Sequence, residues 1–403
     1  MKRFIWTLLL LTVVTTSKAL EVREIPKVEK NSFWAVRSIK IIEAHAHNAL
    51  YRVLKEGKLP RSEERGLQPA TDWTSGFYPG ILWYLYEYTR DPYWRVNAEA
   101  VTQLLEKEQY NENDHDIGFR IGCSYGKGYE FTGKKGYEKV IVQAAQSLST
   151  RFNEKIGIIQ SWNANPQRDW KCPVIIDNMM NLELLYMGAK LSGNKEFERI
   201  ALKHAETTMK YHFRADYSCP HVVDYDPQSG KMRRMDFNNG YSDPQKAAWS
   251  RGQAWALYGY TYMYRVTQNK KFLEHAEHVA TYILDNPNMP DDLVPYWDYN
   301  SPKIPTKRDA SAAAINAAAL LELSTYPVKQ GKRYFKAAER TLQSLSSDQY
   351  LAKPGHNGDF ALMHATGNFM GGSELDNTLV YADYYFIEAL LRYLKLERGE
   401  PLF

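Results

Sequence analysis

From Asn31 onward, apolar residues recur along the chain mainly at helical spacing. Ile39, Ile42, Ala46 and Leu50 follow one another at intervals of three or four residues, which places them on one face of a helix. This pattern predicts an opening helix over about residues 31–56. A similar stripe in YADYYFIEALLRYL predicts a closing helix near the end of the chain.

Between these two helices a unit of two helices and a short polar turn occurs five times. In each unit an apolar helix ends at a turn that carries Gly, Asn, Asp or Pro, which break or cap helices. An amphipathic helix follows, and it begins with an aromatic residue. These aromatic residues are Trp94, Tyr137, Phe197, Phe272 and Tyr334.

Five such pairs and the two terminal helices make twelve helices. The first helix of a pair is apolar on nearly all sides, as in WYLYEY and ALYGYTYMY, whereas the second carries Lys and Glu. Strand-like alternation is short and confined to loops, such as residues 221–225. We therefore predict an all-α fold, an α/α barrel (α/α toroid) of six helical hairpins. No linker divides the chain, so residues 20–403 are expected to form a single α/α-barrel domain.

The first residues have the pattern of a secretory signal peptide. Lys2 and Arg3 precede an apolar run over residues 4–14, and Ser17-Lys18-Ala19 offers a cleavage site with small residues. The run is shorter than the ~20 residues that a membrane-spanning helix needs. We expect residues 1–19 to be removed and the protein to be exported, to a bacterial periplasm; an uncleaved anchor is the alternative.

Composition excludes several classes of protein. Of 403 residues, 44% are hydrophobic and 24% charged, which is typical of a globular protein and not of a disordered chain. Lys and Arg number 51 and Asp and Glu 47, so the formal charge of +4 argues against a nucleic-acid partner. Three cysteines are too few for a disulfide framework and form no CxxC zinc motif. We expect a monomer or weak homo-oligomer, with no membrane contact after signal cleavage.

Chemically distinctive residues gather in the loops between hairpins. Asp177 begins an apolar helix and is flanked by Ile176, Met179 and Met180. Desolvation by such neighbours would raise its pKa, as a general acid near neutral pH requires. The alternative is a helix cap, the commonest use of Asp at a helix start, in which backbone N–H groups would lower that pKa.

Asp116 allows the same two interpretations. It could cap a helix that starts near Gly118, or form an acid pair with Asp177. Enzymes that cleave glycosidic bonds usually use such a pair of carboxyl groups. His115 and His221 could join Asp116 as metal ligands, but no HxH or HExxH spacing connects them. Trp73 and Trp162 lie by the loops and could be either core residues or platforms that stack on sugars.

Eight ordered segments together resemble glycoside hydrolase family 88, the unsaturated glucuronyl hydrolases. The segments are DWTSGFYPGILWYLYEYT (72–89), HDIGF (115–119), IIDNMMNLELLY (175–186), HVVDYDPQSG (221–230), WSRGQAWALYGYT (249–261), VPYWDYN (294–300), RDASAAA (308–314) and GSELDNTLVYADYYFIEALLRY (372–393).

The resemblance implies an α/α six-hairpin barrel that acts on products of polysaccharide lyases. Such products carry a 4,5-unsaturated uronic acid at the non-reducing end. The family hydrates the C4=C5 double bond, after which the ring opens and the aglycone is released. No metal and no organic cofactor are implied.

By the same resemblance, Asp177 is the acid/base that protonates C4 and then deprotonates the water attacking C5. Asp116 would hold sugar hydroxyls and steady the oxocarbenium-like transition state. The substrate-binding residues that it implies are Trp73, His115, Trp162, His221, Asn239, Trp249, Arg251 and Ser373. Asn239 departs from the family, which commonly has Gln there, and the loop over 240–249 is longer, so the sugar preference is the least determined property.

Three other functions remain open at this point. They are an unsaturated rhamnogalacturonyl hydrolase, a non-catalytic periplasmic sugar-binding protein and an ordinary hydrolase of intact chains. The substrate could derive from glycosaminoglycans, gellan or the sulfated rhamnose–glucuronate polymer of green algae. A group of basic residues near the predicted aglycone loop suits a sulfated sugar, although exposed Lys and Arg are common on any surface. This group is Lys231, Arg233, Arg234, Lys246 and Arg251.

Overall fold

A computed structural model describes residues 32–239 and 241–403. The predicted signal peptide over residues 1–19 lies outside the described residues. Within them, no helix is long and apolar enough to cross a membrane. All three cysteines in this part of the chain are buried and unpaired.

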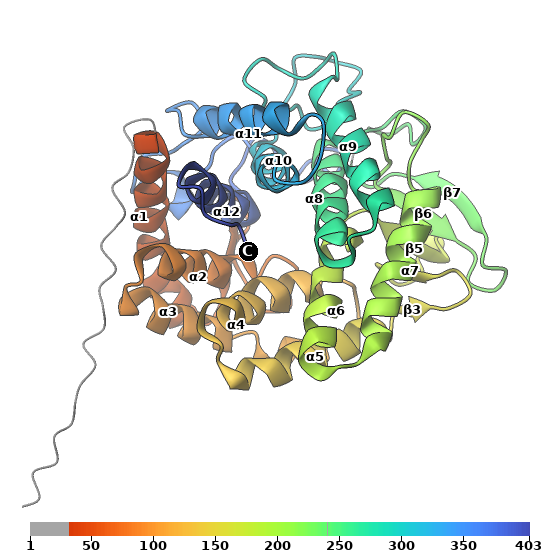
Figure 1. The fold of residues 1–403 in the computed structure, drawn as a ribbon, viewed down its shortest axis with the longest axis horizontal. Helices are drawn as coiled ribbons and strands as arrows, with labels where there is room; N and C mark the ends of the chain where they lie inside the picture. Colours follow the sequence, from red (N-terminus) through yellow and green to blue (C-terminus); the bar gives the residue numbers. More distant parts are fainter. Residues whose placement is uncertain (1–31, 240) are drawn as a thin grey trace, which may run out of the picture.

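Six inner segments form a closed ring, in which each contacts the next and the last contacts the first (Figure 1). Their apolar composition fits this position, and every residue of the inner helix ASAAAINAAALLEL is buried. The inner segments are α2 (Phe77–Thr89), η3 (Gly118–Gly126) continuing into α4 (Lys127–Thr132), α6 (Asn178–Ser192), α8 (Ser250–Thr267), α10 (Ala310–Leu323) and α12 (Val380–Glu397).

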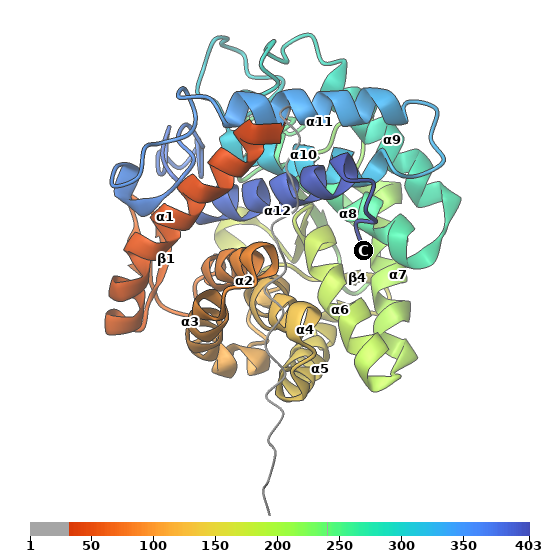
Figure 2. The same cartoon turned by 60° about the vertical axis from the view of Figure 1, so that its left-hand side comes forward.

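Six amphipathic helices cover the ring from outside, and α1 packs against both α12 and α2 (Figure 2). They are α1 (Phe33–Glu56), α3 (Pro92–Gln103), α5 (Lys135–Ser149), α7 (Lys195–Tyr211), α9 (Lys270–Leu284) and α11 (Gly331–Leu345). The predicted α/α barrel of six hairpins is therefore confirmed.

Two of the turns within hairpins share a local cause. Helix α6 ends at Gly193 in the left-handed conformation, and the side chain of Asn194 then accepts a hydrogen bond from the N–H of Glu196 to begin α7. Gln268 and Asn269 repeat this arrangement between α8 and α9. A left-handed residue followed by a capping side chain reverses the chain within two residues. Short turns keep each outer helix antiparallel to its inner partner.

Short antiparallel strands occupy the loops at one end of the barrel, including the one predicted around residues 221–225. Three of them form a single sheet in the order β5-β6-β7. The strands are β1 (Leu59–Ser62), β2 (Gly66–Gln68), β3 (Phe152–Asn153), β4 (Ile158–Ile159), β5 (Cys172–Ile175), β6 (Val222–Tyr225) and β7 (Met232–Asp236).

Candidate active site

A cavity of about 170 Å³ lies where the inner helices α6, α8 and α12 begin. Aromatic, acidic and basic side chains converge on it from five different loops. The lining residues are Arg61, Trp73, Asp116, Trp162, Ile175, Asp177, His221, Asn238, Asn239, Trp249, Arg251, Gly367, Asn368, Glu374 and Tyr381. Both aspartates that the sequence singled out therefore share one pocket.

The pairing of strands β5 and β6 places His221 beside Asp177. Ile175 pairs with Val222 in this antiparallel sheet. The pairing continues just beyond the two strands, where the N–H of Ile176 donates to the carbonyl of His221. Nε2 of His221 consequently lies 3.3 Å from Oδ1 of Asp177. His221 and Asp177 are 44 residues apart in the sequence, and the register of the sheet brings them into direct contact.

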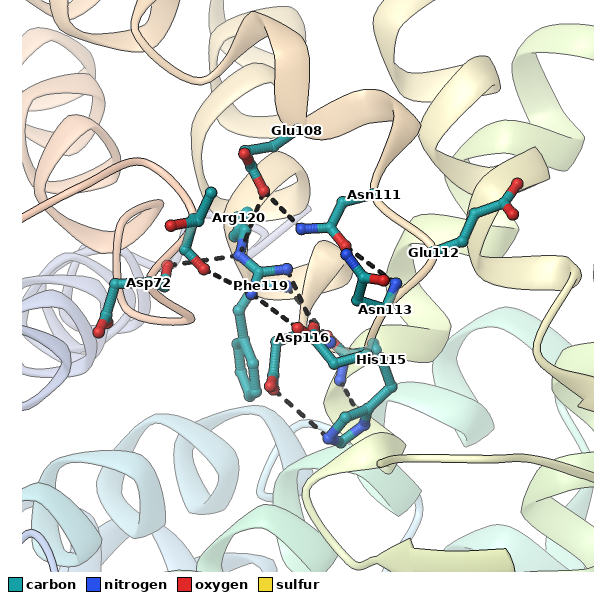
Figure 3. A network of polar contacts seen from close by, with 12 residues as sticks. Asp72, Glu108, Asn111, Glu112, Asn113, His115, Asp116, Phe119 and Arg120 are labelled. Atoms are coloured by element: carbon teal, nitrogen blue, oxygen red, sulfur yellow. Dashed lines mark hydrogen bonds and ion pairs between the residues drawn. The ribbon is translucent and has the colours of Figure 1, made fainter. Parts of the chain in front are cut away.

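A second histidine–aspartate pair lies at the start of η3. Nε2 of His115 is 3.4 Å from Oδ1 of Asp116. Figure 3 shows the His115 ring and the Asp116 carboxylate turned toward each other, with Arg120 above them. Arg120 in turn binds both carboxylate oxygens of Asp114 at 3.0 Å. The ion pair holds the segment that carries Asp116.

Hydrogen bonds to the far ring nitrogen set the tautomer of both histidines. The amide of Asn181 accepts the N–H of Phe119 through Oδ1, which turns its Nδ2 donor toward Nδ1 of His115 at 3.1 Å. The backbone N–H of Asn239 donates to Nδ1 of His221 at 2.9 Å. Since Nδ1 accepts in each ring, the proton of the neutral imidazole is on Nε2, facing an aspartate.

The two aspartates differ in the direction in which the pocket shifts their pKa. Burial alone would raise the pKa of Asp177, but the contact with His221 and the nearby His115 and Arg251 hold it below its usual value. Burial and the charge of Asp114 raise the pKa of Asp116 well above its usual value. The pocket therefore moves the pKa values of the two carboxyl groups apart, and such a difference allows the two groups to have different roles.

Two expectations about these aspartates were wrong. The apolar neighbours of Asp177 do desolvate it, but polar contacts from other loops outweigh that effect, so its pKa is lowered and not raised. Neither aspartate caps a helix with its side chain: Asp177 makes no such hydrogen bond, and the cap position before Gly118 belongs to Ile117. Both carboxylates instead point into the pocket.

The other predicted binding residues divide into three groups. Trp73, Trp162, Asn239, Trp249 and Arg251 line the cavity together with His221. His115 is fully buried behind Asp116. Ser373 is not among the lining residues; its backbone pairs with that of Asn368, which is.

Several buried polar atoms in this region have no hydrogen bond to the described residues, although both histidine nitrogens and Oδ1 of Asp177 lie in the close pairs given above. They are Nε2 of His115, Oδ1 of Asp177, Nε2 of His221, Oδ1 of Asn239 and Nε of Arg251. Asp177, His221, Asn239 and Arg251 line the cavity, so it presents both donors and acceptors to a hydroxylated, carboxylated ring.

Sequence reasoning missed Arg61, Glu374 and Tyr381. Arg61 in β1 binds Glu374 at 2.9 Å and Asp72 at 2.8 Å, and so joins loops more than 300 residues apart. Glu374 adjoins the predicted Ser373, and Tyr381 is in the first turn of the predicted closing helix. Arg61 gave no comparable signal, because a single arginine in a short strand has no local pattern.

The predicted basic group does not face the cavity as a set of free cations. Arg233 pairs with Asp169 and Asp224, and Arg234 pairs with Asp169 and Asp236. Lys246 lies 3.4 Å from Asp243. Arg251 alone of this group reaches the pocket, where it binds Asp309.

Among the described residues, no three or more His, Cys, Asp or Glu side chains are grouped in a way that could hold a metal ion.

Residues 50–395 match the model of Glycosyl Hydrolase Family 88. An unsaturated glucuronyl hydrolase of Formosa agariphila is 46% identical over 80% of each chain, and one of a Bacillus species is 34% identical over 83% of this chain and 88% of that one. The solved structure of an unsaturated glucuronyl hydrolase specific for heparin superposes with a TM-score of 0.86 at 46% identity, covering 91% of this chain and 98% of the other.

Proposed function

Because the chain belongs to glycosyl hydrolase family 88, we propose that its pocket hydrates the 4,5-unsaturated uronic acid at the non-reducing end of polysaccharide-lyase products. The protein is a glycosidase, an unsaturated glucuronyl hydrolase. One observation carries the assignment of the site: two aspartates of opposite pKa shift, each facing a histidine of fixed tautomer, meet in one buried cavity.

The reaction begins with proton transfer from the protonated Asp177 to C4, while the electrons of the double bond leave C5 with oxocarbenium character. The Asp177 carboxylate then removes a proton from the water whose oxygen bonds to C5, giving a hemiketal. Cleavage of the bond between C5 and the ring oxygen leaves a ketone at C5 and a hemiacetal at C1. Collapse of that hemiacetal releases the aglycone, and one water is consumed overall.

Asp177 must be protonated for the first step, although its surroundings in the protein lower its pKa. The substrate supplies the change, because its carboxylate enters the cavity as a like charge and a nearby like charge raises the pKa of a carboxyl. Asp116, whose pKa is already raised, is neutral and donates a hydrogen bond to a sugar hydroxyl. We therefore assign Asp116 to binding through its proton and not through its charge.

A time course on an unsaturated disaccharide tests the reaction. Hydration removes the ultraviolet band of the conjugated double bond at the same rate as mass spectrometry records release of the aglycone. Aglycone that accumulates while the band persists would indicate direct cleavage at C1, and no change in either signal would indicate a binding protein. An unsaturated rhamnogalacturonyl disaccharide in parallel distinguishes the neighbouring family.

The proposed substrates are sulfated glycosaminoglycan oligosaccharides. The heparin-specific enzyme named above and an unsaturated chondroitin disaccharide hydrolase of Streptococcus agalactiae, 29% identical over 81% of this chain, support this class. A panel of unsaturated disaccharides from heparin, chondroitin and the green-algal rhamnose–glucuronate polymer tests it through kcat/KM for each.

We also propose export of the enzyme, on the basis of the basic, apolar and small-residue pattern in residues 2–19. The N-terminal sequence of protein recovered from the periplasm should begin near Leu20. Enzyme found only in the cytosol with Met1 retained would contradict export.

A further inference from the structure

Beside the cavity, two indole rings form a continuous aromatic wall. Trp162 lines the cavity, and the ring of Trp170 stacks against it with centroids 5.6 Å apart and planes 25° apart. Trp170 is buried, and its Nε1 donates to Asp236 at 2.7 Å. Backbone hydrogen bonds of 2.9 Å in both directions between Asn165 and Trp170 close the intervening loop. The wall is therefore rigid.

Arg168 extends this wall. Its guanidinium lies 5.1 Å from the centroid of the Trp170 ring, on that closed loop, where the Asn165 side chain accepts the N–H of Arg168. The guanidinium donates to the carbonyl of Phe237 at 3.2 Å and to Oδ1 of Asn238 at 3.3 Å. Asn238 itself lines the cavity, so Arg168 stands at the cavity's edge.

Arg168 differs from the other arginines around it in its charge balance. Arg233 and Arg234, on the neighbouring strand β7, both pair with carboxylates. In the described part of the chain, both acceptors of the Arg168 guanidinium are neutral, and no ion pair neutralises it. A guanidinium has five N–H donors, so an exposed one with two of them in use can still bind an oxyanion.

We propose that Arg168 forms an anion subsite for the sugars that follow the unsaturated uronic acid, and that it binds a sulfate or carboxylate group there. This inference rests on the proposed function. The sugar ring would stack on Trp162, and its substituents would reach the edge of the cavity at Asn238, to which Arg168 donates. The subsite is a specificity determinant and takes no part in bond breaking.

The test compares KM for unsaturated glucuronyl-N-acetylgalactosamine with and without a 6-sulfate, for the wild type and Arg168→Gln. Gln removes the charge and keeps a flat polar end. Because hydrogen bonds to charged groups are stronger than neutral ones, we expect KM for the sulfated disaccharide to rise about 10-fold or more. KM for the unsulfated disaccharide and kcat for both should stay unchanged. Arg168→Lys should restore part of the affinity.

Arg199→Gln is the matched control, since it removes an equal charge from α7, where Arg199 pairs with Glu154 and Glu196. It should change KM for neither substrate. An unsulfated unsaturated tetrasaccharide forms a second arm: a rise in KM with this substrate and not with the sulfated disaccharide would assign the subsite to a carboxylate instead of a sulfate.

Two results would overturn the subsite: KM values that Arg168→Gln changes for none of the three substrates, or equal changes for both disaccharides. In either case the enzyme still turns over. Wild-type protein that consumes none of these substrates would instead contradict the proposed function, so the two failures are distinguishable.

Discussion

Asp177 carries the chemistry at the scale of a single residue. Asp177→Asn keeps the shape of the side chain and an acceptor for Nε2 of His221, 3.3 Å away. It cannot exchange a proton, so we expect kcat to fall by about 10²–10⁴-fold or more. Because the side chain caps no helix, the melting temperature should hardly change. Double-bond loss and thermal unfolding of one variant measure both quantities, and retained turnover would remove Asp177 from the mechanism.

Asp116→Asn tests the neutral state that we assign to Asp116. An amide is also neutral and can donate a hydrogen bond, so KM should rise by about 10-fold or less, because a neutral hydrogen bond is worth about 0.5–1.5 kcal/mol. The loss of kcat should be much smaller than for Asp177→Asn. A collapse of kcat as large as that of Asp177→Asn would show that the charge or the proton of Asp116 acts in the reaction.

Asn181 acts on the site through His115. Asn181→Asp has nearly the same shape but places an acceptor opposite Nδ1 of His115, so the ring proton must move to Nδ1 or the ring must become cationic. The pKa of His115 is now lowered to about 4 by burial, and a facing carboxylate raises it. We expect a lower kcat, by about 10-fold or more by analogy with other acid–base contacts, and a new ionisation in the pH profile.

Asn316→Asp is the control for this change. Asn316 is a buried asparagine on the inner helix α10, and its nearest polar partner is the Tyr299 hydroxyl. Both variants bury a new carboxyl and should lose stability. Only Asn181→Asp should alter the pH profile of kcat. An identical pH profile in both variants would show that the role of Asn181 is structural only.

At the scale of elements, glycines permit the inner helices to approach one another. A Cβ on Gly259 of α8 would lie 2.5 Å from the Cβ of Met179 on α6, close to Asp177. Gly259→Ala should therefore destabilise the protein by about 1–3 kcal/mol, the usual effect of overpacking. Because α6 begins directly after Asp177, we also expect lower activity.

Gly136 on the outer helix α5 supplies the comparison. A Cβ there meets nothing within 4 Å, so Gly136→Ala should stabilise the helix by up to ~1 kcal/mol through reduced backbone entropy of the unfolded chain. Denaturant titration of the two variants measures the difference. Equal changes in the free energy of unfolding for Gly259→Ala and Gly136→Ala would show that α6 and α8 can move apart to accommodate the added methyl group.

At the scale of the whole molecule, buried histidines make stability depend on pH. Burial lowers the pKa of His115 and His212 to about 4 and of His204 and His275 to about 3. The unfolded chain, with histidine pKa values near ~6.5, binds more protons than the folded one between these limits. The stability that these histidines contribute is therefore full above about pH 6.5 and is lost as the pH falls toward 4.

His275→Gln isolates one of these groups, since His275 packs among Phe213, Tyr260 and Tyr217 away from the cavity. Between pH 6 and 4 the free energy of unfolding should change less steeply with pH in the variant than in the wild type. The difference in slope should be about one proton, or ~1.4 kcal/mol per pH unit. Asp383 acts in the opposite direction, because burial raises its pKa to about 7. An unchanged slope in the variant would show that His275 is protonated in the folded state.

The sequence by itself determined the twelve helices, their pairing and the ring. These follow from local causes: an apolar inner segment, a breaker or cap, and an amphipathic outer segment, all readable within about 25 residues. It also located both aspartates and most of the pocket wall, because these residues lie at the ends of predicted helices and in segments that resemble the family. Asp177 and Asp116 could be placed but not assigned a protonation state.

Only the tertiary structure decided that state, and the reason is distance along the chain. Asp177 takes its pKa from His221 and Arg251, and Asp116 takes its pKa from burial and Asp114. The strand register and barrel closure bring such partners together, and no local pattern encodes that contact. The same holds for the surface charges: Asp169, from another loop, pairs with Arg233 and Arg234, while Arg168 meets only neutral acceptors among the described residues.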